Sequence, residues 1–281
     1  MTIALGTVIH NHNIRYFNDF IYSVNNQTEQ NFTLVVVLDN ILEDSLENLD
    51  VISHVLIKPK NITPALNRQH LINYIVNNNF DYCIFADGDD ILDVNYIQSV
   101  KSSLIENKVV FTDLNLILND NNRYIISDYY QNLVPSDVDL KFLKDKNCLG
   151  FSNSGFRTDL INENIQIPLD MVAVDWYFYS KLMITYNVTA KFIPKSLINY
   201  RIHEENLAGY NNLNEELIRK TIEIKLNFYN AMSKINHRYS NFHVKYSKLA
   251  ELINDEDYFL KLSDRVFKKY KNKKFLWWQI I

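Results

Sequence analysis

Glycine, proline and cysteine are all scarce in this sequence of 281 residues. With 5 glycines and 5 prolines, it excludes a collagen-like repeat and a long flexible linker, because both need a high content of these residues. The two cysteines, Cys83 and Cys148, are too few for a disulfide scaffold. Cys83 lies in the apolar run 82–86, which favours a small buried side chain.

Long apolar runs and a basic surplus are also missing. No stretch of 18 apolar residues occurs, and no basic segment followed by an apolar one opens the chain, so we expect a cytosolic protein. The formal net charge is −4, and the isoelectric point is near 6.0. These values argue against a general nucleic-acid binder, which usually carries a basic surplus, and we expect no nucleic-acid partner.

Apolar residues are plentiful enough for a large core, at 47% of the chain. Short apolar runs predict buried strands at 3–9, 32–38, 51–57 and 82–86. Helical spacing predicts helices between them: over 14–24, from Thr63-Pro64 to about 77, and after Asp93. This alternation predicts an α/β fold with a mostly parallel sheet and helices on both faces.

The second half of the chain has a looser pattern. Strand-like pieces occur at 109–111, 114–118 and 124–126, and further strand-like segments at 188–202 are interrupted by Pro194. Helices are expected over 170–186 and from about 211 onward. We therefore divide the chain into a domain over 1–205 and a helical extension over 206–281.

Segment 85–90, Phe-Ala-Asp-Gly-Asp-Asp, places three carboxylates directly after a buried strand. Ligands of open parallel sheets bind beyond the carboxyl ends of the strands. Neighbouring carboxylates repel one another unless a cation is present, and Mg²⁺ or Mn²⁺ completed by phosphate oxygens is the natural partner. An acidic turn or helix N-terminus is the alternative, since aspartate is common there. A calcium loop fits less well because its glycine and terminal glutamate are missing.

Several phrases occur here in the order found in one enzyme family. They are Ser-Val-Asn-Asn-Gln-Thr at 23–28, a strand that ends in Asp39, Ala-Leu-Asn-Arg at 65–68 and Asp-Gly-Asp-Asp at 87–90. In this respect the sequence resembles the inverting glycosyltransferases of family 2, which have the GT-A fold. The resemblance covers about residues 1–205 and is strongest over the first hundred.

The resemblance implies roles for four polar residues. Asp39 matches the acid that accepts a hydrogen bond from the nucleotide base, and Arg68 matches a basic residue beside the nucleotide. Asp89 matches the ligand of Mn²⁺ or Mg²⁺, and Asp87 matches an acid that contacts ribose or the donor sugar.

Two departures from the family pattern concern the base site. The family has Asp-Asp-Gly-Ser where this chain has Leu-Asp-Asn-Ile at 38–41, and Pro-Thr-Tyr-Asn where it has Ile-His-Asn-His at 9–12. The aromatic residue that packs on the base is therefore missing, which leaves His10 or His12 as its replacement.

The resemblance also implies an acceptor side. Val174-Asp175-Trp176 matches the phrase that supplies the catalytic base, so Asp175 is the candidate base and Trp176 a candidate sugar platform. A helix-capping role for Asp175 and a core position for Trp176 are the alternatives. Gly155 lies in a segment, 153–157, that resembles the acceptor lining.

Tyr-Arg-Ile-His at 200–203 matches a further family phrase. In it, His203 is a candidate metal ligand and Arg201 a candidate fork for the donor diphosphate. A histidine that only packs in the core or faces solvent is the alternative for His203.

The stretch 258–281 combines seven Lys or Arg residues with one acid and two adjacent tryptophans. A basic amphipathic helix of this kind is typical of peripheral contact with an anionic membrane. A terminal helix docked on the protein, with its basic face in solvent, and a partner interface are the alternatives.

The resemblance as a whole implies transfer of a sugar from a nucleotide-diphosphate sugar, a UDP-sugar first of all. The acceptor would be a glycan or lipid-linked glycan hydroxyl in bacterial surface polysaccharide synthesis (capsule, O-antigen or lipopolysaccharide) at the inner face of the membrane. A non-catalytic nucleotide-sugar-binding protein and a metal-dependent nucleotidyltransferase or phosphohydrolase are the alternatives.

Overall fold

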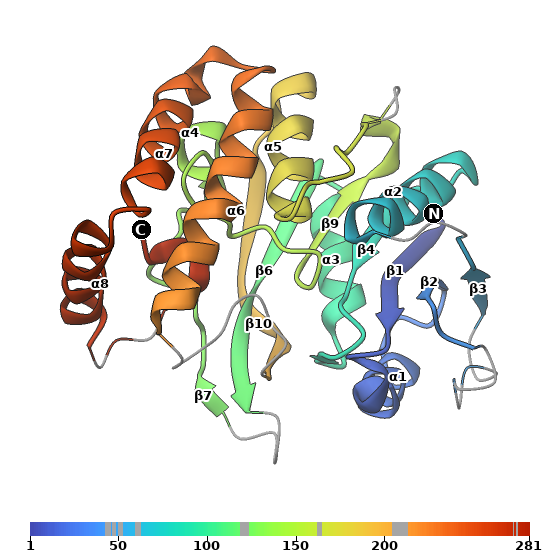
Figure 1. The fold of residues 1–281 in the computed structure, drawn as a ribbon. Coiled ribbons are helices and arrows are strands. Elements are labelled where there is room, and N and C mark those ends of the chain that lie inside the picture. Colours follow the sequence, from blue (N-terminus) through green and yellow to red (C-terminus); the bar gives the residue numbers. More distant parts are fainter. Residues whose placement is uncertain are drawn as a thin grey trace.

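A computed structural model describes residues 1–42, 46, 49, 53–59, 63–118, 124–161, 165–203, 213–271, 273 and 275–281. Within this part of the chain, one ten-stranded sheet carries helices on both faces (Figure 1). The strands are β1 (Ile3–His10), β2 (Thr33–Asp39), β3 (His54–Ile57), β4 (Tyr82–Phe85), β5 (Ile91–Leu92), β6 (Val109–Leu118), β7 (Tyr124–Ile126), β8 (Asp137–Val138), β9 (Ser154–Arg157) and β10 (Ala190–Ile202). The helices are α1 (Phe17–Asn25), α2 (Pro64–Asn77), α3 (Tyr96–Leu104), α4 (Leu140–Leu143), α5 (Val174–Tyr186), α6 (Glu215–Ser233), α7 (Ser240–Leu252) and α8 (Glu256–Tyr270).

The sheet has the strand order β3-β2-β1-β4-β9-β6-β10-β5. The first four strands in this order are parallel, as the strand–helix alternation predicts. β9 runs antiparallel between β4 and β6, and β10 is parallel to β6. Consequently β1, β4 and β10 all end at the same edge of the sheet. The predicted α/β class is confirmed.

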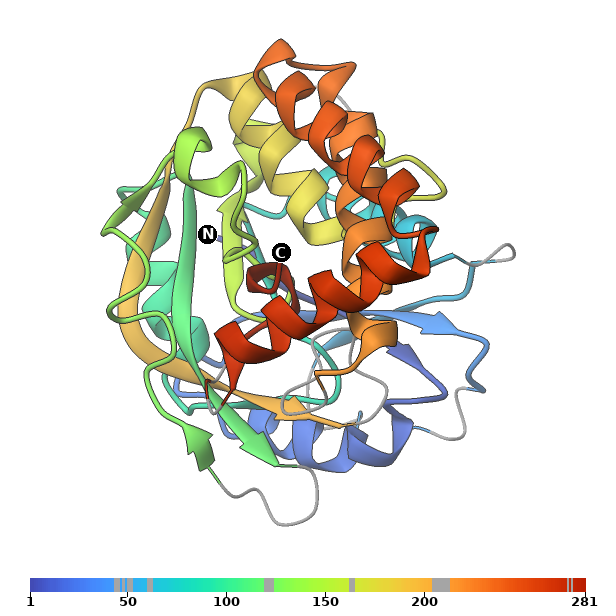
Figure 2. The ribbon, with the colours of Figure 1, turned by 60° about the vertical axis from the view of Figure 1, so that its left-hand side comes forward.

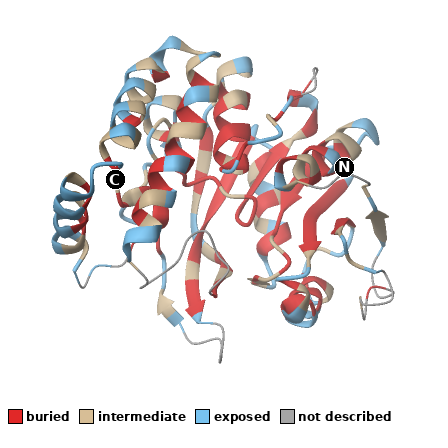
Figure 3. Ribbon diagram, viewed as in Figure 1, coloured by how far each residue is buried: buried red, intermediate tan, exposed pale blue. Residues whose placement is uncertain are grey.

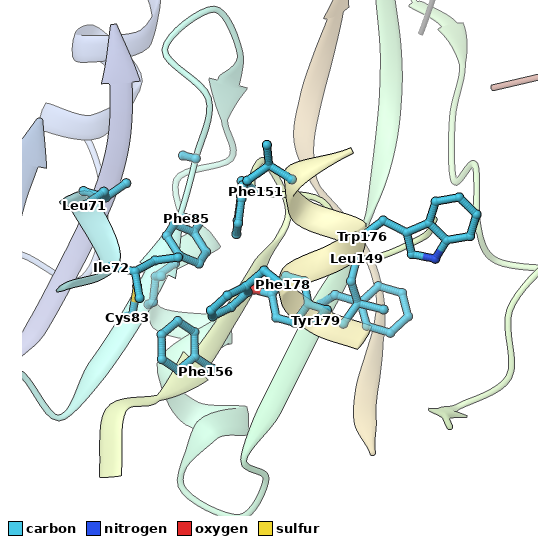
Figure 4. Packing of buried hydrophobic residues seen from close by; sticks show 14 of the residues in the cluster. Leu71, Ile72, Cys83, Phe85, Leu149, Phe151, Phe156, Trp176, Phe178 and Tyr179 are labelled. Carbon is cyan, nitrogen blue, oxygen red and sulfur yellow. The ribbon is translucent and has the colours of Figure 1, made fainter. Parts of the chain in front are cut away.

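Helices α2 and α5 lie together on one face of the sheet, and α3 lies on the other. A Cβ on Gly6 of β1 would come within 3.1 Å of Ile75 on α2, so the glycine lets this helix pack closely on the strand. Phe178 of α5 packs on Phe156 of β9, with ring centroids 5.5 Å apart (Figure 4). Each fully buried phenylalanine of this kind contributes about 1.5–3 kcal/mol.

Most predicted elements appear with small shifts at their ends. The cap of α2 is confirmed, since the Thr63 side chain accepts a hydrogen bond from the Leu66 backbone N–H at 3.2 Å. The strand expected at 51–57 is confirmed over β3, while positions 51 and 52 lie outside the described residues. Pro194 does not interrupt the strand expected at 188–202. Instead β10 continues through it with register shifts, because a bulge accommodates a residue that cannot donate to the ladder.

The C-terminal helices gather on the same side of the sheet as α5 (Figure 2). Phe228 of α6 stacks on Trp176 of α5 at a centroid distance of 3.8 Å. Trp277 and Trp278, 7% and 6% exposed, belong to the same core as the sheet. The residues that we assigned to an extension therefore share the core of the first part.

Helix α8 docks through its apolar side. Phe259 and Val266 join a small cluster with Ile218 and Ile222 of α6, while the outer side of α8 is exposed (Figure 3). Because both C-terminal tryptophans are buried, they are not exposed as membrane anchors. Among the described residues, no helix combines the length and hydropathy needed to cross a bilayer.

Candidate active site

A cavity of about 280 Å³ opens at the edge where β1, β4 and β10 end. The residues that line it come from eight parts of the chain: the end of β1, helix α2, the turn after β4, the loop after α4, the start of α5, the end of β10, helix α6 and the C-terminal turn. They include His10, His12, Asn13, Arg68, Asp87, Asp89, Asn147, Asp175, Tyr200, His203 and Trp277. Six of the ten residues predicted from the sequence are thus brought to one cavity.

The acidic turn after β4 is tied down on several sides. Asp87 forms an ion pair with Arg68 of α2. Asp90 is 1% exposed, and its carboxylate accepts a hydrogen bond from the Arg201 backbone N–H at 2.9 Å. Burial raises the pKa of Asp87, and burial together with the charges of its neighbours raises that of Asp90 well above its usual range. Concentrated negative charge in a buried turn favours a cation beside it.

Asp89 and His203 form the best candidate metal centre. Asp89 Oδ2 and His203 Nε2 lie 2.9 Å apart, and both side chains line the cavity. Within the residues that the structure describes, no three His, Cys, Asp or Glu side chains gather closely enough to hold a metal ion on their own. Mg²⁺ in nucleotide sites is commonly held by one or two protein groups and by substrate phosphates. One carboxylate and one imidazole therefore fit an ion that binds together with a diphosphate.

Arg201 braces the acidic turn and is not among the residues that line the cavity. It is 1% exposed. Its Nε donates to the Asp89 carbonyl oxygen at 2.8 Å, and its Nη2 donates to the Asp19 carboxylate at 2.7 Å. The guanidinium carbon also lies 4.7 Å from the centre of the Tyr16 ring. In this arrangement the side chain positions Asp89 from behind, which differs from the diphosphate contact expected from the sequence.

Replacing Arg201 with Lys is expected to lower the melting temperature and to weaken manganese-dependent nucleotide binding. Arg201 uses two separate nitrogens for the Asp89 carbonyl and Asp19, and the single lysine nitrogen does not reproduce this spacing, so we expect at least one of the two hydrogen bonds to be lost, at a cost of about 1–3 kcal/mol. Thermal melts and titration with UDP and Mn²⁺ measure the two effects. Asp19→Asn is the comparison and should have the smaller effect, because the Asp19 side chain is 50% exposed. An Arg201→Lys protein with wild-type melting and binding would contradict this role.

His10 and Asp39 lie at the ends of the neighbouring strands β1 and β2. His10 lines the cavity, and burial lowers its pKa, so its imidazole favours the neutral form. Its Nδ1 is buried and has no hydrogen-bond partner among the described residues. Asp39 pairs in register with His10 at the end of β2, and its carboxylate accepts a hydrogen bond from Asn67 Nδ2 at 2.8 Å. Asp39 therefore lies beside the cavity, outside its lining.

Asp175 lies in the first turn of α5 and lines the cavity. Its Oδ1 accepts hydrogen bonds from the Trp176 backbone N–H at 2.7 Å and from Asn147 Nδ2 at 3.2 Å. Burial raises its pKa to about 6. A carboxylate with a raised pKa is a better proton acceptor than an exposed one and remains ionised at neutral pH.

The two other acceptor-side residues predicted from the sequence lie in the core. Trp176 is fully buried, and its Nε1 donates to the Leu143 carbonyl oxygen at 2.7 Å, so the core alternative describes its position. Gly155 lies in the middle of β9, where a Cβ would come within 2.9 Å of the Cys83 carbonyl oxygen and 3.0 Å of Val100. Close packing against β4 and α3 explains the glycine.

Sequence reasoning missed Asn147 and Trp277. Asn147 comes from a polar loop with no distinctive pattern, and only its hydrogen bond to Asp175 reveals it. Trp277 belongs to the short 3-10 helix Trp277–Gln279. From the sequence it was interpreted as part of the basic amphipathic stretch 258–281. Its distance along the chain from the other site residues gave no signal that it lines the same cavity.

The phrase at 23–28 holds the segment that follows the acidic turn. Ser23 Oγ accepts a hydrogen bond from the Leu92 backbone N–H at 3.1 Å. Gln27 Nε2 donates to the Asp93 carbonyl oxygen at 2.8 Å, and Gln27 Oε1 accepts from the Ile97 backbone N–H at 3.0 Å. The phrase therefore supports the site from outside it.

No family model matches the chain, and no curated protein matches it in sequence. Solved structures do resemble it. S. aureus TarS 1-349 in complex with UDP-GlcNAc is 14% identical with a TM-score of 0.62, over 88% of this chain and 71% of that one. The mannosyltransferase PcManGT from Pyrobaculum calidifontis, in complex with GDP-Man and Mn²⁺, is 11% identical with a TM-score of 0.58, over 95% and 74%. The fold is thus of the GT-A type that these glycosyltransferases share.

Proposed function

We propose that this protein is an inverting glycosyltransferase that moves a sugar from a nucleoside diphosphate sugar to a hydroxyl group. One observation carries the proposal: the Asp89–His203 pair and the Asp175 carboxylate line the same cavity at the carboxyl ends of the strands. An ion held by the pair would stabilise the charge on the departing diphosphate. A carboxylate in the same cavity would remove the proton of the attacking acceptor hydroxyl. The GT-A fold of the similar structures is consistent with this assignment.

Asp89 and His203 would hold Mn²⁺ or Mg²⁺, which supplies Lewis-acid stabilisation of the departing diphosphate. Asp87, in the same turn, and Arg68, which forms an ion pair with it, would orient the donor. His10 lies at the end of β1 with an unpartnered, buried Nδ1 among the described residues, so it is the candidate contact for the nucleotide base. Asp39 supports that end of the cavity from the neighbouring strand.

Asp175 is the proposed base. It accepts the proton of the acceptor hydroxyl while the oxygen attacks the anomeric carbon on the face opposite the diphosphate, which inverts that carbon. The hydrogen bonds from Asn147 and the Trp176 backbone fix the orientation of the carboxylate. Asn147 is therefore a positioning residue in this assignment.

The biological acceptor that we propose is a bacterial surface glycan, free or lipid-linked, as the family resemblance implies. Membrane contact through 258–281 would use the exposed basic side of α8 alone, since Trp277 and Trp278 are buried. Binding to anionic vesicles that falls steeply with salt would support such contact.

Release of nucleoside diphosphate from a panel of nucleotide sugars tests the function. The full chain is incubated with UDP- and GDP-sugars and Mn²⁺, with and without sugar acceptors, and with EDTA as the control. We expect one donor to be consumed, faster with acceptor and not with EDTA. Nucleotide binding without turnover would instead favour a binding protein, and release of pyrophosphate from a nucleoside triphosphate and a sugar phosphate would favour a nucleotidyltransferase.

The rate of transfer is expected to depend on pH through Asp175. Because the pKa of this carboxyl is raised to about 6, it is protonated below that value and cannot accept a proton. kcat/KM should rise about tenfold per pH unit below about pH 6 and level off above it. Initial rates between about pH 5 and about pH 8, with nucleotide affinity measured at each pH, give the profile. A flat profile with unchanged affinity would contradict the assignment of Asp175.

A further inference from the structure

A small side cavity adjoins the candidate active site. Its volume is about 70 Å³, against about 280 Å³ for the main cavity. Asn147, Asp175, Tyr200 and Trp277 line both cavities. Asp175 therefore lies where the two cavities meet. A molecule that places one group in the side cavity would have its adjoining atoms beside this proposed base.

Two residues that line the side cavity each carry a buried polar atom with no hydrogen-bond partner in the described part of the chain. The atoms are Nε1 of Trp278 and Oδ1 of Asn147, from side chains that are 6% and 8% exposed. The amide nitrogen of Asn147 already donates to Asp175, which leaves its oxygen as an acceptor. Buried polar groups without partners are rare and costly, so a donor and an acceptor left open beside one cavity indicate a ligand that supplies both partners.

The lining also includes the apolar side chains of Leu114, Leu276 and Trp277 and the polar residues Ser152 and Asn153. The Asn153 amide is already hydrogen-bonded to the Gly150 N–H and the Thr112 carbonyl oxygen. A water-sized site needs roughly 10–15 Å³, so the side cavity, at about 70 Å³, has room for about five to seven such sites, enough for a group of four non-hydrogen atoms. An acetamido group has this size and presents one N–H, one carbonyl oxygen and one methyl group.

We propose that the side cavity binds the acetamido group of an N-acetylated hexosamine at the end of the acceptor glycan, an inference that rests on the proposed function. The acetamido N–H donates to Asn147 Oδ1, its carbonyl oxygen accepts from Trp278 Nε1, and its methyl packs on the apolar lining.

The position of the side cavity favours the acceptor over the donor as the source of this group. Asp87, Asp89 and His203 line the main cavity and do not line the side cavity. The donor diphosphate belongs with that acidic turn, whereas the acceptor hydroxyl must reach Asp175. Asp175 is also the one charged residue of the side-cavity lining in the described chain, which disfavours an anionic substituent.

Acceptor kinetics with Trp278→Phe test the proposal, because this change removes the indole N–H and keeps an aromatic ring. The acceptors are aryl β-glycosides of N-acetylglucosamine, N-acetylgalactosamine, glucose and galactose, used with the donor identified from the panel. We expect the wild type to have the lower KM for an N-acetylated acceptor than for its plain counterpart. Trp278→Phe should raise that KM about five- to tenfold and so narrow the difference between the two. Tyr124→Phe, at an exposed position on β7, is the control and should leave all values unchanged.

Equal KM values for N-acetylated and plain acceptors in the wild type would overturn the proposal. The proposal would also be overturned if Trp278→Phe raised the KM for an N-acetylated donor and left the KM for the acceptor unchanged. If Trp278→Phe has a lowered melting temperature, saturation-transfer NMR tests the proposal instead, with the N-acetylated acceptor, UDP and Mn²⁺ added to the wild type. The acetamido methyl should then receive the strongest signal, and a stronger signal at the sugar ring protons would count against it. Manganese-dependent affinity for UDP tests the proposed function separately, because it needs no acceptor.

Discussion

Asp175→Asn is expected to reduce transfer by about 10²–10⁴-fold, the range that loss of a general base produces, and at the same time to raise the melting temperature. Asn cannot accept the hydroxyl proton. Its side-chain oxygen can still accept hydrogen bonds from the Trp176 backbone and Asn147, so the shape of the site is preserved. Manganese-dependent UDP affinity should remain, which separates loss of the base from loss of the fold.

The gain in stability follows from the pKa of Asp175, about 6 in the folded protein against an ordinary value of 3.8. The folded state holds this proton more tightly than the unfolded state, so the ionised carboxylate lowers stability above the folded pKa. The advantage of Asn is therefore largest above about pH 6 and disappears as the pH falls through the ordinary value.

Melts at about pH 7.5 and about pH 4 measure this advantage. Asp257→Asn, an exposed acid in the first turn of α8, is the matched control. It should leave activity unchanged and lower stability slightly, since it removes a favourable charge at a helix N-terminus. Full transfer activity in Asp175→Asn would contradict the assignment of Asp175 and show that another group accepts the proton.

The sequence predicted the elements whose patterns are local. Apolar runs and caps placed β1, β2, β4 and α2 within a few residues, because burial of one face and a side-chain cap act over short distances. The pairing of β9 between β4 and β6 was not predicted, since two short registers of three residue pairs each, between distant segments, leave no local pattern.

The same division applies to the site. Asp87, Asp89 and His203 were found because each follows a strand and belongs to a phrase, and strand ends converge at one edge. Arg201 belongs to such a phrase too, but its role depends on Asp19 and Tyr16, which lie far from it in sequence. Trp277 reaches the cavity only because the C-terminal helices fold back on α5. Contacts of this kind depend on tertiary packing.

Asp89→Ala is expected to remove manganese-dependent nucleotide binding and to reduce transfer by about 10²–10³-fold or more, the loss seen when one group that stabilises the transition-state charge is deleted. Asp89 supplies the carboxylate of the proposed metal pair, and His203 alone offers a single imidazole nitrogen. Titration with UDP and with GDP, each with Mn²⁺ and with EDTA, measures the effect. EDTA should weaken nucleotide binding in the wild type and change nothing further in the variant.

His203→Ala should have the smaller effect, because the carboxylate keeps its charge and its attraction for the ion. Asp159→Ala removes an exposed acid that pairs with Arg157 and should behave as the wild type. If Asp89 and His203 share one ion at the acidic turn, manganese-dependent nucleotide binding should fall most in Asp89→Ala and less in His203→Ala. It should not fall in Asp159→Ala. If Mn²⁺ improved UDP affinity in Asp89→Ala as much as in the wild type, the ion would bind elsewhere, and the acidic turn would be a structural feature of the fold.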